Sequence, residues 1–455
     1  MTVMMRSDGD LHPLPMLENL IVGLGATGMS VARHLAACGE TFAVVDSREH
    51  PPGLEALRSE LQPNEVHLGG FDRTLFLRAR RLIVSPGVPV SSPAILEARA
   101  AGAQVIGDIE LFARVNRAPV AAITGSNGKS TVTSLLGEMA RTAGWDVAVG
   151  GNLGTPALDL LDAKPQDLVV LELSSFQLET VESLAPQAAV VLNVSPDHLD
   201  RYPSLEAYAQ AKGRIYTRAR RCVVNAEDPL AISLAGGRDC AAFGLGEAAR
   251  EQDYGLLVHA GAQWLARGTE PLIPAARLRI AGRHNLANAL AALAMGEALG
   301  LPQTAMLKTL ETFPGLSHRC QWVGSRAGVD WFDDSKGTNV GATVAAIDGL
   351  EGQLVLIAGG QGKGQDFAPL REALKGRARA VVLLGEAAPE LRSVLGGVAE
   401  LIDVADMPEA VAVAAERARA GDRVLLSPAC ASLDMFANYA ARGEAFVRAF
   451  RELSA

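Results

Sequence analysis

Residues 120–130 read Val-Ala-Ala-Ile-Thr-Gly-Ser-Asn-Gly-Lys-Ser, an apolar run that leads into a glycine loop and then into Lys129 and Ser130. The apolar run predicts a buried strand, and the Lys-Ser pair predicts the start of a helix. In a P-loop, backbone N–H groups surround phosphate oxygens, the lysine neutralises them, and the hydroxyl group reaches Mg²⁺. Ile123 departs from the strict pattern, which has glycine there. We interpret the segment as an ATP-binding loop rather than as an ordinary strand–helix turn that carries a lysine by chance.

Short apolar runs of the same kind recur on both sides of this loop. Most are rich in β-branched residues and end at glycine or a polar residue, which is typical of parallel strands buried on both faces. We predict such strands at 20–22, 41–45, 82–84, 120–124, 168–171, 189–193, 222–225, 354–358, 380–384 and 423–426. Helical patterns alternate with them, for example at 129–143, 286–299 and 408–419. This order predicts an α/β protein with a Rossmann-like N-terminal domain (1–107), a central P-loop ATPase-type domain with a parallel sheet (108–315) and a Rossmann-like C-terminal domain (316–455).

Composition and charge exclude several classes of protein. Of the 455 residues, 49% are hydrophobic, which excludes a mainly disordered chain. The net charge of −9 offers no broad cationic surface, so we do not expect nucleic-acid binding. The five cysteines lack C-x-x-C spacing and indicate reduced thiols rather than a disulfide framework or a zinc site. Asp8, Asp10 and His12 interrupt the N-terminal region, and no apolar run is long enough to span a membrane, so we expect a cytoplasmic protein.

A second glycine loop, Gly23-Leu-Gly-Ala-Thr-Gly28, follows the first predicted strand, and the next strand leads to Asp46. The spacing suits a loop whose backbone N–H groups bind a pyrophosphate, with Asp46 near the ribose hydroxyls. The local sequence leaves three interpretations open: a UDP-type ligand, a dinucleotide such as NAD, or a structural turn. A lone GxGxxG motif does not decide among them.

Two more predicted strands end in residues that suit a magnesium site beside the P-loop. Glu172 closes the strand that begins at Leu168, and His198 follows the strand at 189–193. An acid that holds Mg²⁺ belongs at the carboxyl edge of such a sheet, so we predict that both residues contribute. The alternatives are a surface carboxylate for Glu172 and a structural histidine for His198.

Several motifs together resemble those of the Mur ligases. They are Thr124-Gly-Ser-Asn-Gly-Lys-Ser130, Gly150-Gly-Asn-Leu-Gly154, Leu171-Glu-Leu-Ser-Ser-Phe-Gln177, Asp197-His-Leu-Asp-Arg-Tyr202, Gly282-Arg-His-Asn-Leu-Ala-Asn288, Ser317-His-Arg319, Asp334-Ser-Lys-Gly-Thr-Asn339 and Ser427-Pro-Ala-Cys-Ala-Ser-Leu-Asp-Met-Phe436. The resemblance covers essentially the whole chain. Folylpolyglutamate synthases share the central motifs, but we do not expect them to carry this first domain or the Ser-Pro-Ala-Cys-Ala-Ser segment.

The resemblance implies an enzyme of peptidoglycan precursor synthesis that joins D-glutamate to UDP-N-acetylmuramoyl-L-alanine. In such ligases the carboxylate of the nucleotide sugar attacks the γ-phosphate of ATP, and the amine of the amino acid then displaces phosphate from the acyl phosphate. The implied cofactors are ATP and two Mg²⁺ ions, and the implied partners are these small-molecule substrates. We expect a monomer that binds neither nucleic acid nor membranes.

The resemblance also assigns residues to each substrate. The implied catalytic residues are Lys129, Glu172, His198 and Lys212. Those implied for ATP are Gly125, Ser126, Asn127, Gly128, Lys129, Ser130, Thr131, Asn285, Asn288, Arg319 and Asp334, with His318 beside them. Those implied for the UDP-sugar are Thr27, Asp46, Ser47, Arg48, Gly87, Asn152, Ser174 and His198. Those implied for glutamate are Lys336, Thr338, Lys363, Ser432, Leu433 and Tyr439. From local sequence alone, Asn285 and Asn288 also fit a helix N-cap with surface polarity, and Lys363 fits a loop lysine without a partner.

Lys212 shows what the resemblance adds to the local sequence. It lies in a predicted helix at 204–218, where a lysine is ordinarily solvated. In the ligases that the chain resembles, the matching lysine is carbamylated by CO₂, which turns a cation into an anion able to hold the second Mg²⁺. The implied metal ligands are therefore Ser130, Glu172, His198 and carbamylated Lys212.

The chain departs from the Mur ligase pattern at three positions in the predicted glutamate domain. Gln361 replaces an acidic residue, Gly337 an alanine and Tyr439 a phenylalanine. None of the three removes a catalytic charge, so they bear on how the amino acid is positioned. Two alternatives remain beside the main hypothesis: the same chemistry with L-glutamate or another acceptor, and a non-catalytic protein that binds ATP or a nucleotide sugar. The complete catalytic set argues against the second.

Overall fold

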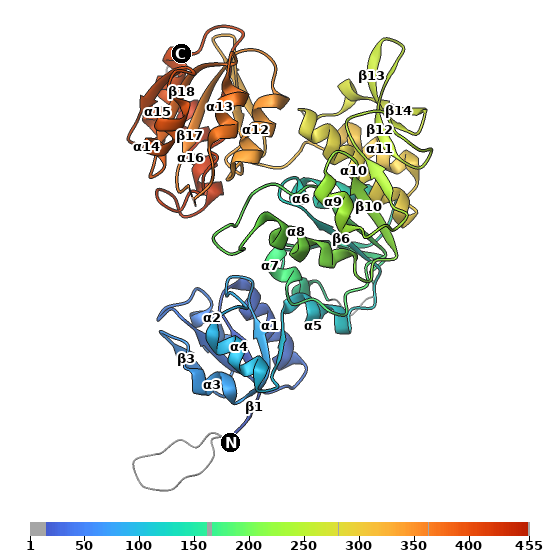
Figure 1. Cartoon of the computed structure of the whole chain (residues 1–455), viewed down its shortest axis with the longest axis vertical. Coiled ribbons are helices and arrows are strands. Elements are labelled where there is room, and N and C mark those ends of the chain that lie inside the picture. Colours follow the sequence, from blue (N-terminus) through green and yellow to red (C-terminus); the bar gives the residue numbers. More distant parts are fainter. Residues whose placement is uncertain (1–14, 162–165, 281, 363, 454–455) are drawn as a thin grey trace.

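A computed structural model describes residues 15–161, 166–280, 282–362 and 364–453, which form three α/β units, each with its own sheet (Figure 1). This architecture confirms the predicted fold class. The domain boundaries after residues 107 and 315 stay predictions. Among the described helices, none has the length and apolar character needed to cross a membrane.

The first sheet holds five parallel strands in the order β3-β2-β1-β4-β5. The strand order reverses between β1 and β4, so the glycine loop after β1 opens at the edge where ligands bind in doubly wound sheets. The strands are β1 (Leu17–Val22), β2 (Ala43–Asp46), β3 (Val66–Leu68), β4 (Ala79–Val84) and β5 (Gln104–Ile106). The helices are α1 (Ala26–Ala37), α2 (Leu54–Glu60), α3 (Arg73–Leu77) and α4 (Pro93–Ala100).

The central sheet runs in the order β14-β13-β12-β11-β10-β9-β6-β8-β7, with β6 between β9 and β8. These three strands are parallel, so the P-loop, Glu172 and the loop that carries His198 lie at one edge. The strands are β6 (Val120–Thr124), β7 (Val147–Gly151), β8 (Leu168–Glu172), β9 (Ala188–Val191), β10 (Arg221–Asn225), β11 (Ala241–Phe243), β12 (Tyr254–His259), β13 (Ala262–Arg267) and β14 (Glu270–Pro274). The helices are α5 (Asp108–Val115), α6 (Lys129–Thr142), α7 (Ser175–Leu178), α8 (Leu205–Gly213), α9 (Pro229–Leu234), α10 (Arg283–Leu299) and α11 (Gln303–Thr312).

The strands β12, β13 and β14 pair antiparallel and extend the central sheet beyond the predicted parallel strands. Ala260 and Gly261 join β12 to β13 with φ angles of 51° and 77°, the backbone of a tight hairpin turn. Val258 is 78% exposed, so the hairpin is not covered on both faces. The prediction missed these strands because it relied on continuous apolar runs, which only strands covered on both faces require.

The third sheet has the order β15-β16-β20-β17-β18-β19, in which only the β15–β16 pair is antiparallel among the described strands. Its strands are β15 (Gln321–Arg326), β16 (Val329–Asp333), β17 (Leu354–Gly359), β18 (Ala378–Leu384), β19 (Glu400–Asp403) and β20 (Arg423–Leu426). Its helices are α12 (Val340–Gly349), α13 (Ala368–Leu374), α14 (Ala388–Leu395), α15 (Met407–Arg417) and α16 (Tyr439–Glu452). The continuous apolar runs predicted at β17, β18 and β20 are buried.

The helix predicted at 204–218 is shorter in the structure. It ends as α8 at Gly213, and a 3₁₀ turn (Arg214–Tyr216) follows. Arg214 donates hydrogen bonds to the carbonyl oxygens of Leu178 and Val181, and the Tyr216 hydroxyl donates to the carbonyl of Val223. Because Arg214 and Tyr216 are hydrogen-bonded to residues outside α8, the α-helix ends at Gly213, one residue after Lys212.

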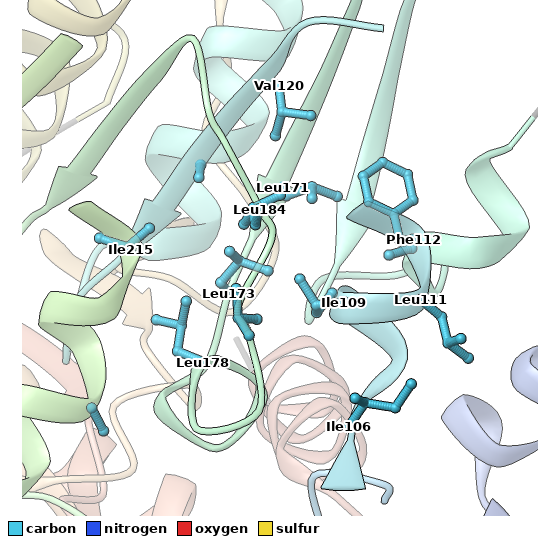
Figure 2. Close-up of a cluster of buried hydrophobic side chains, with 14 of the residues drawn as sticks. Ile106, Ile109, Leu111, Phe112, Val120, Leu171, Leu173, Leu178, Leu184 and Ile215 are labelled. Carbon is cyan, nitrogen blue, oxygen red and sulfur yellow. The ribbon is translucent and has the colours of Figure 1, made fainter. Parts of the chain in front are cut away.

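One apolar cluster joins the first unit to the central one. Figure 2 shows Ile109 of α5 beside Leu173 of the central unit, and the same cluster includes Ile106 of β5 and Phe112 of α5. At this junction the Asp108 carboxylate is fully buried and accepts a hydrogen bond from Gln177 Nε2 at 3.2 Å. Burial raises the pKa of Asp108 to about 6, against the effect of that hydrogen bond.

The raised pKa of Asp108 predicts a pH-dependent stability. Its carboxyl group holds its proton to higher pH when folded than when unfolded, so its contribution to the free energy of unfolding falls as pH rises from about 4 to above 6. Asp108→Asn removes this titration. We compare the free energy of unfolding of Asp108→Asn with that of the parent at each pH. The difference, variant minus parent, should increase by up to about 3 kcal/mol between pH 4 and pH 7. Denaturant unfolding at both pH values measures it, and a pH-independent difference would contradict it.

Candidate active site

Three cavities meet where the three units face one another. The first, between β1, β4 and the central unit, is lined by Thr27, Asp46, Ser47, Arg48, Gly87 and Asn152. The second is lined by Asn127, Gly128, Thr131, Asn285, Asn288, Arg319 and Asp334. The third, of about 380 Å³, lies between them and is lined by Ser126, Lys129, Ser130, Asn152, Glu172, Ser174, His198, Lys212, Lys336, Thr338, Ser432, Leu433 and Tyr439. Almost all of the predicted site residues therefore gather in one connected region.

The glycine loop between β6 and α6 has the backbone that phosphate binding requires. Gly128, the N-cap of α6, has a φ of +82°, and a Cβ there would lie 2.4 Å from Asn288 Oδ1. Only glycine fits both this left-handed backbone and this close approach. Asn127 N–H donates to Asn193 Oδ1 at 2.8 Å, and Asn193 Nδ2 donates back to Asn127 O at 3.0 Å. These contacts fix the loop at the N-terminus of α6, where the helix dipole favours an anion.

Two lysines converge on one carbonyl oxygen of this loop. The ammonium groups of Lys129 and Lys212 each lie 2.8 Å from Gly125 O, and Lys129 also donates to Ser126 O at 2.9 Å. Burial lowers the pKa of both lysines, and the charge of Lys129 lowers the pKa of Lys212 further. Lys212 is only 1% exposed, so the solvated alternative for this residue is wrong. Positive charge on Lys129 therefore disfavours a second positive charge on Lys212.

Glu172 has the geometry of a cation ligand. Its Oε1 accepts a hydrogen bond from Asn152 Nδ2 at 2.6 Å, while Oε2 is buried and has no hydrogen-bond partner. The side chain is 2% exposed, so the surface-carboxylate alternative is wrong. A buried carboxylate oxygen without a partner is costly, and a bound cation would satisfy it. Among the described residues, no three His, Cys, Asp or Glu side chains form a ready-made metal cluster.

His198 lies at the rim of the third cavity with a strained backbone. Its φ is +55°, a left-handed value that is uncommon for a residue with a Cβ. Its ring packs edge-to-face on Phe176 with 4.7 Å between centroids. Such strain persists where the surrounding structure imposes it and is common at functional sites. Phe176 belongs to one of the motifs quoted above, but no local pattern indicated that it would support His198.

The second cavity places two asparagines beside the P-loop. Asn288 Nδ2 donates to Asn285 Oδ1 at 3.0 Å, and both residues are buried inside α10. The N-cap of α10 is Gly282, so the N-cap alternative for the two asparagines is wrong. Across the cavity, Asp334 accepts from Ser427 Oγ at 2.7 Å and from Cys320 N at 3.0 Å. Burial raises the pKa of Asp334 to about 7.

In the first cavity the protein itself uses both oxygens of Asp46. Oδ2 accepts from Leu24 N at 2.7 Å and from Arg48 Nη2 at 2.8 Å, and Oδ1 accepts from Arg48 N and Nε, each at 2.9 Å. Although burial alone would raise it, these hydrogen bonds lower the pKa of Asp46 to about 2. Asp46 thus positions the Arg48 guanidinium at the cavity, and does not offer the two free oxygens that ribose recognition in a dinucleotide site would use.

The third unit supplies cations and hydroxyl groups to the central cavity. Lys336 lies over the Tyr439 ring at 4.1 Å from its centroid, and burial, aided by the charges of Arg319 and Lys129, lowers its pKa to about 8. Arg442 is fully buried and donates to Ser335 O at 2.8 Å and Cys430 O at 3.1 Å, so it ties together the loops that carry Lys336 and Ser432. Lys363 lies outside the described residues.

The three departures from the family pattern have different surroundings. A Cβ on Gly337 would lie 2.6 Å from both Asp334 Oδ2 and Ser427 Oγ, so glycine lets that hydrogen-bonded pair approach the loop. Gln361 is held through its backbone, which exchanges two hydrogen bonds with Ala431 at 2.9 and 3.0 Å. Tyr439 packs against Lys336 through its ring.

Contacts between the central and third units involve residues whose roles local sequence did not reveal. Arg319 Nη2 donates to Ser130 Oγ at 2.6 Å, and Asn339 Nδ2 donates to Asn127 Oδ1 at 3.2 Å and to Asp197 Oδ2 at 3.3 Å. His318, placed beside the nucleotide by the resemblance, is absent from the residues that line the described cavities and instead bonds to Asp333 Oδ2 at 2.7 Å. Ser174 faces the central cavity and caps α7.

Comparison with known protein families yields three matches along the chain. Residues 18–107 match the Mur ligase MurD-like N-terminal domain, residues 123–296 the Mur ligase middle domain, and residues 318–430 the Mur ligase glutamate ligase domain. The three matched ranges contain most of the cavity-lining residues, while Ser432, Leu433 and Tyr439 lie beyond the third range.

Individual relatives extend the comparison over nearly the full length. UDP-N-acetylmuramoylalanine--D-glutamate ligase of Nitrosococcus oceani is 57% identical over 97% of this chain and 98% of its own. The protein of the same name from Pseudomonas putida is 54% identical over 94% of this chain and 96% of its own. Among solved structures, the MurF ligase of Thermotoga maritima in complex with ADP has the same fold, with a TM-score of 0.59 at 17% identity over 96% of this chain and 95% of its own.

Proposed function

The chain belongs to the Mur ligase family, and from this premise we propose that it joins D-glutamate to UDP-N-acetylmuramoyl-L-alanine at the expense of ATP. The N-terminal cavity would hold the uridine diphosphate, the second cavity the adenine nucleotide, and the third unit the amino acid. The reaction belongs to the synthesis of peptidoglycan precursors. The relatives' names and the domain matches support the activity, and the three converging cavities support the placement of the substrates.

The observation that carries the proposal is the cluster of cations in the central cavity. Lys129, Arg319 and Lys336 all line it, although the protein as a whole carries a net charge of −9. A ligase of this kind must bring the carboxylate of the sugar peptide to the γ-phosphate of ATP, and two anions approach only where positive charge is fixed between them. The dicarboxylate amino acid adds a third anion to the same place.

The reaction proceeds in two steps. A carboxylate oxygen of the sugar peptide attacks the γ-phosphorus, the bond to ADP breaks, and an acyl phosphate forms. The amine of glutamate then attacks the acyl carbon, loses a proton, and expels inorganic phosphate. We assign to Lys129, at the P-loop, the role of neutralising charge on the transferred phosphoryl group, and to Lys336 and Thr338, which line the same cavity, the role of orienting glutamate.

The residues present fit magnesium. Glu172 Oε2 lacks a partner, Ser130 Oγ lies at the P-loop, and His198 lines the same cavity. Mg²⁺ binds oxygen ligands and usually keeps several waters, so one carboxylate and a hydroxyl together with substrate phosphates suffice for one ion. When bound, Mg²⁺ would neutralise charge on the phosphates. A second ion would need another anionic ligand, and we propose that Lys212 supplies it as a carbamate formed from CO₂.

Isotope transfer tests the two-step reaction. If the sugar-peptide carboxylate is labelled with ¹⁸O, the label is expected in the released phosphate. When the amine attacks, the bond between the acyl carbon and the bridging oxygen breaks, and that labelled oxygen leaves with the phosphate. Phosphate that carries no label would show that water cleaves ATP directly, and would contradict the acyl phosphate.

Arg319 tests the contribution of the third unit to ATP binding. Arg319→Ala removes the guanidinium that bridges to Ser130 Oγ, and we expect KM for ATP to rise about tenfold. The matched control is Arg417→Ala, which removes an exposed ion pair with Glu400. Steady-state kinetics at saturating sugar peptide and D-glutamate measures the change. An unchanged KM for ATP would exclude this role.

A further inference from the structure

Two cysteines that the catalytic site does not use lie side by side in the central sheet. Cys222 and Cys240 immediately precede Val223 and Ala241, whose Cα atoms are partners in the parallel β10–β11 pair. Neighbouring strands lie about 4.8 Å apart, which is within the Cα separation of about 4.4–6.8 Å that a disulfide spans. Both side chains belong to the same buried cluster, so they project from the same side of the sheet.

The surroundings make the two thiols chemically different. Arg238 Nη1 donates to Cys222 Sγ at 3.2 Å and to the carbonyl oxygens of Tyr216 and Ala219. The neighbouring Cys240 thiol, aided by Arg238 and opposed by burial, lowers the pKa of Cys222 to about 6. The same contact raises the pKa of Cys240. Of the two thiols, Cys222 therefore ionises more readily.

The pair lies just below the surface. Cys222 is 6% exposed and Cys240 is 5% exposed, and the neighbouring Arg238 and Asp239 are exposed. A small oxidant needs to pass only this short loop. The other buried cysteines, Cys320 and Cys430, have pKa values raised by burial, which disfavours the reactive thiolate.

We propose that Cys222 and Cys240 form a reversible dithiol–disulfide pair that hydroperoxides oxidise. The Cys222 thiolate attacks a peroxide oxygen, the O–O bond breaks, and with one proton taken up the products are a sulfenic acid and water or an alcohol. Cys240 sulfur then attacks the sulfenic sulfur, the S–S bond forms, and the hydroxyl group leaves as water with the Cys240 proton. The two sulfurs lose two electrons to the peroxide. A small dithiol reverses the reaction by exchange.

Mass spectrometry of the full-length protein tests this proposal. In a Cys38→Ser background, which removes the exposed thiol, hydrogen peroxide at pH 7 should remove two hydrogen atoms from the intact mass. Peptide mapping should link Cys222 to Cys240, and dithiothreitol should restore the starting mass. Products that only gain oxygen atoms, or a disulfide between other cysteines, would overturn the proposal.

Two variants test the roles of Cys240 and Arg238 in the oxidation of Cys222. Cys240→Ser should stop the reaction at a Cys222 sulfenic acid that dimedone traps, and no trapped adduct at Cys222 would overturn the proposed order of attack. Arg238→Gln should slow the oxidation at least about fivefold, because the thiolate loses its cation. The matched control Arg220→Gln removes a neighbouring exposed arginine instead and should leave the rate unchanged. Equal slowing in both variants would contradict the role of Arg238.

Discussion

Replacing Lys129 with methionine is expected to lower kcat/KM for phosphate release about 10³-fold. Methionine keeps the length and the apolar stem of the side chain but removes the cation that lies at the P-loop beside Gly125 O and Ser126 O. The loss should fall mainly on kcat, because charge on the transferred phosphoryl group is greatest in the transition state. Steady-state assays with saturating substrates measure it.

The control for Lys129 separates catalysis from folding. Lys129 is half-buried, and burial lowers the pKa of its ammonium group, so removing the charge relieves a desolvation cost that offsets the two lost hydrogen bonds. The thermal midpoint of Lys129→Met should therefore equal or exceed that of the parent. Lys308→Met, an exposed position on α11, should change neither property. A Lys129→Met enzyme that kept a third or more of its activity would contradict the assignment of the P-loop lysine.

Replacing Lys212 with alanine is expected to lower kcat by about 10³-fold and to create a requirement for an added carboxylate. Lys212 lines the central cavity from α8, so the deletion leaves space that opens toward the substrates. If the active form of Lys212 is a carbamate, then acetate or formate in that space should restore part of the activity, because the anion rather than the stem is needed.

Charge and shape controls sharpen the Lys212 experiment. Ethylamine has a similar size to acetate but the opposite charge, and it should give no rescue. Lys212→Met fills the space and should respond to neither compound. Rescue by ethylamine alone, or parent-like activity of unrescued Lys212→Ala, would contradict the carbamate. A ¹³C NMR carbamate signal in labelled bicarbonate, absent from Lys212→Ala, provides a readout that does not depend on activity.

The elements that lie within one stretch of sequence could be predicted. The strand at 120–124, its glycine loop and the helix from Lys129 occur as expected, because continuous burial on both faces produces an apolar run that is visible locally. The sequence analysis did not predict the hairpin β12–β13, because one end of it is exposed to solvent. It did not predict β15 for a similar reason, since Trp322 in that strand is 58% exposed. Partly exposed strands of this kind leave a weaker pattern.

The arrangement of the candidate site could be predicted only through the resemblance. From its local sequence Lys212 looks like a solvated lysine on a helix, yet it is buried because α8 packs over the P-loop. Arg319 reaches Ser130 across 189 residues of chain, and Asn339 reaches Asn127 across 212. Such contacts depend on how separate units face one another, which local spacing does not encode. The glycine-loop motif likewise indicated that Asp46 lies at the first cavity, but it did not indicate that Asp46 pairs with Arg48.

The most direct measurement is phosphate release from ATP in the presence of UDP-N-acetylmuramoyl-L-alanine, with D-glutamate, with L-glutamate and with no amino acid. We predict strong turnover with D-glutamate alone and a product whose mass has increased by one glutamyl residue. Turnover with L-glutamate instead would keep the ligase chemistry and direct attention to Gly337 and Gln361. ATP binding without phosphate release under any of the three conditions would contradict the proposed ligase activity.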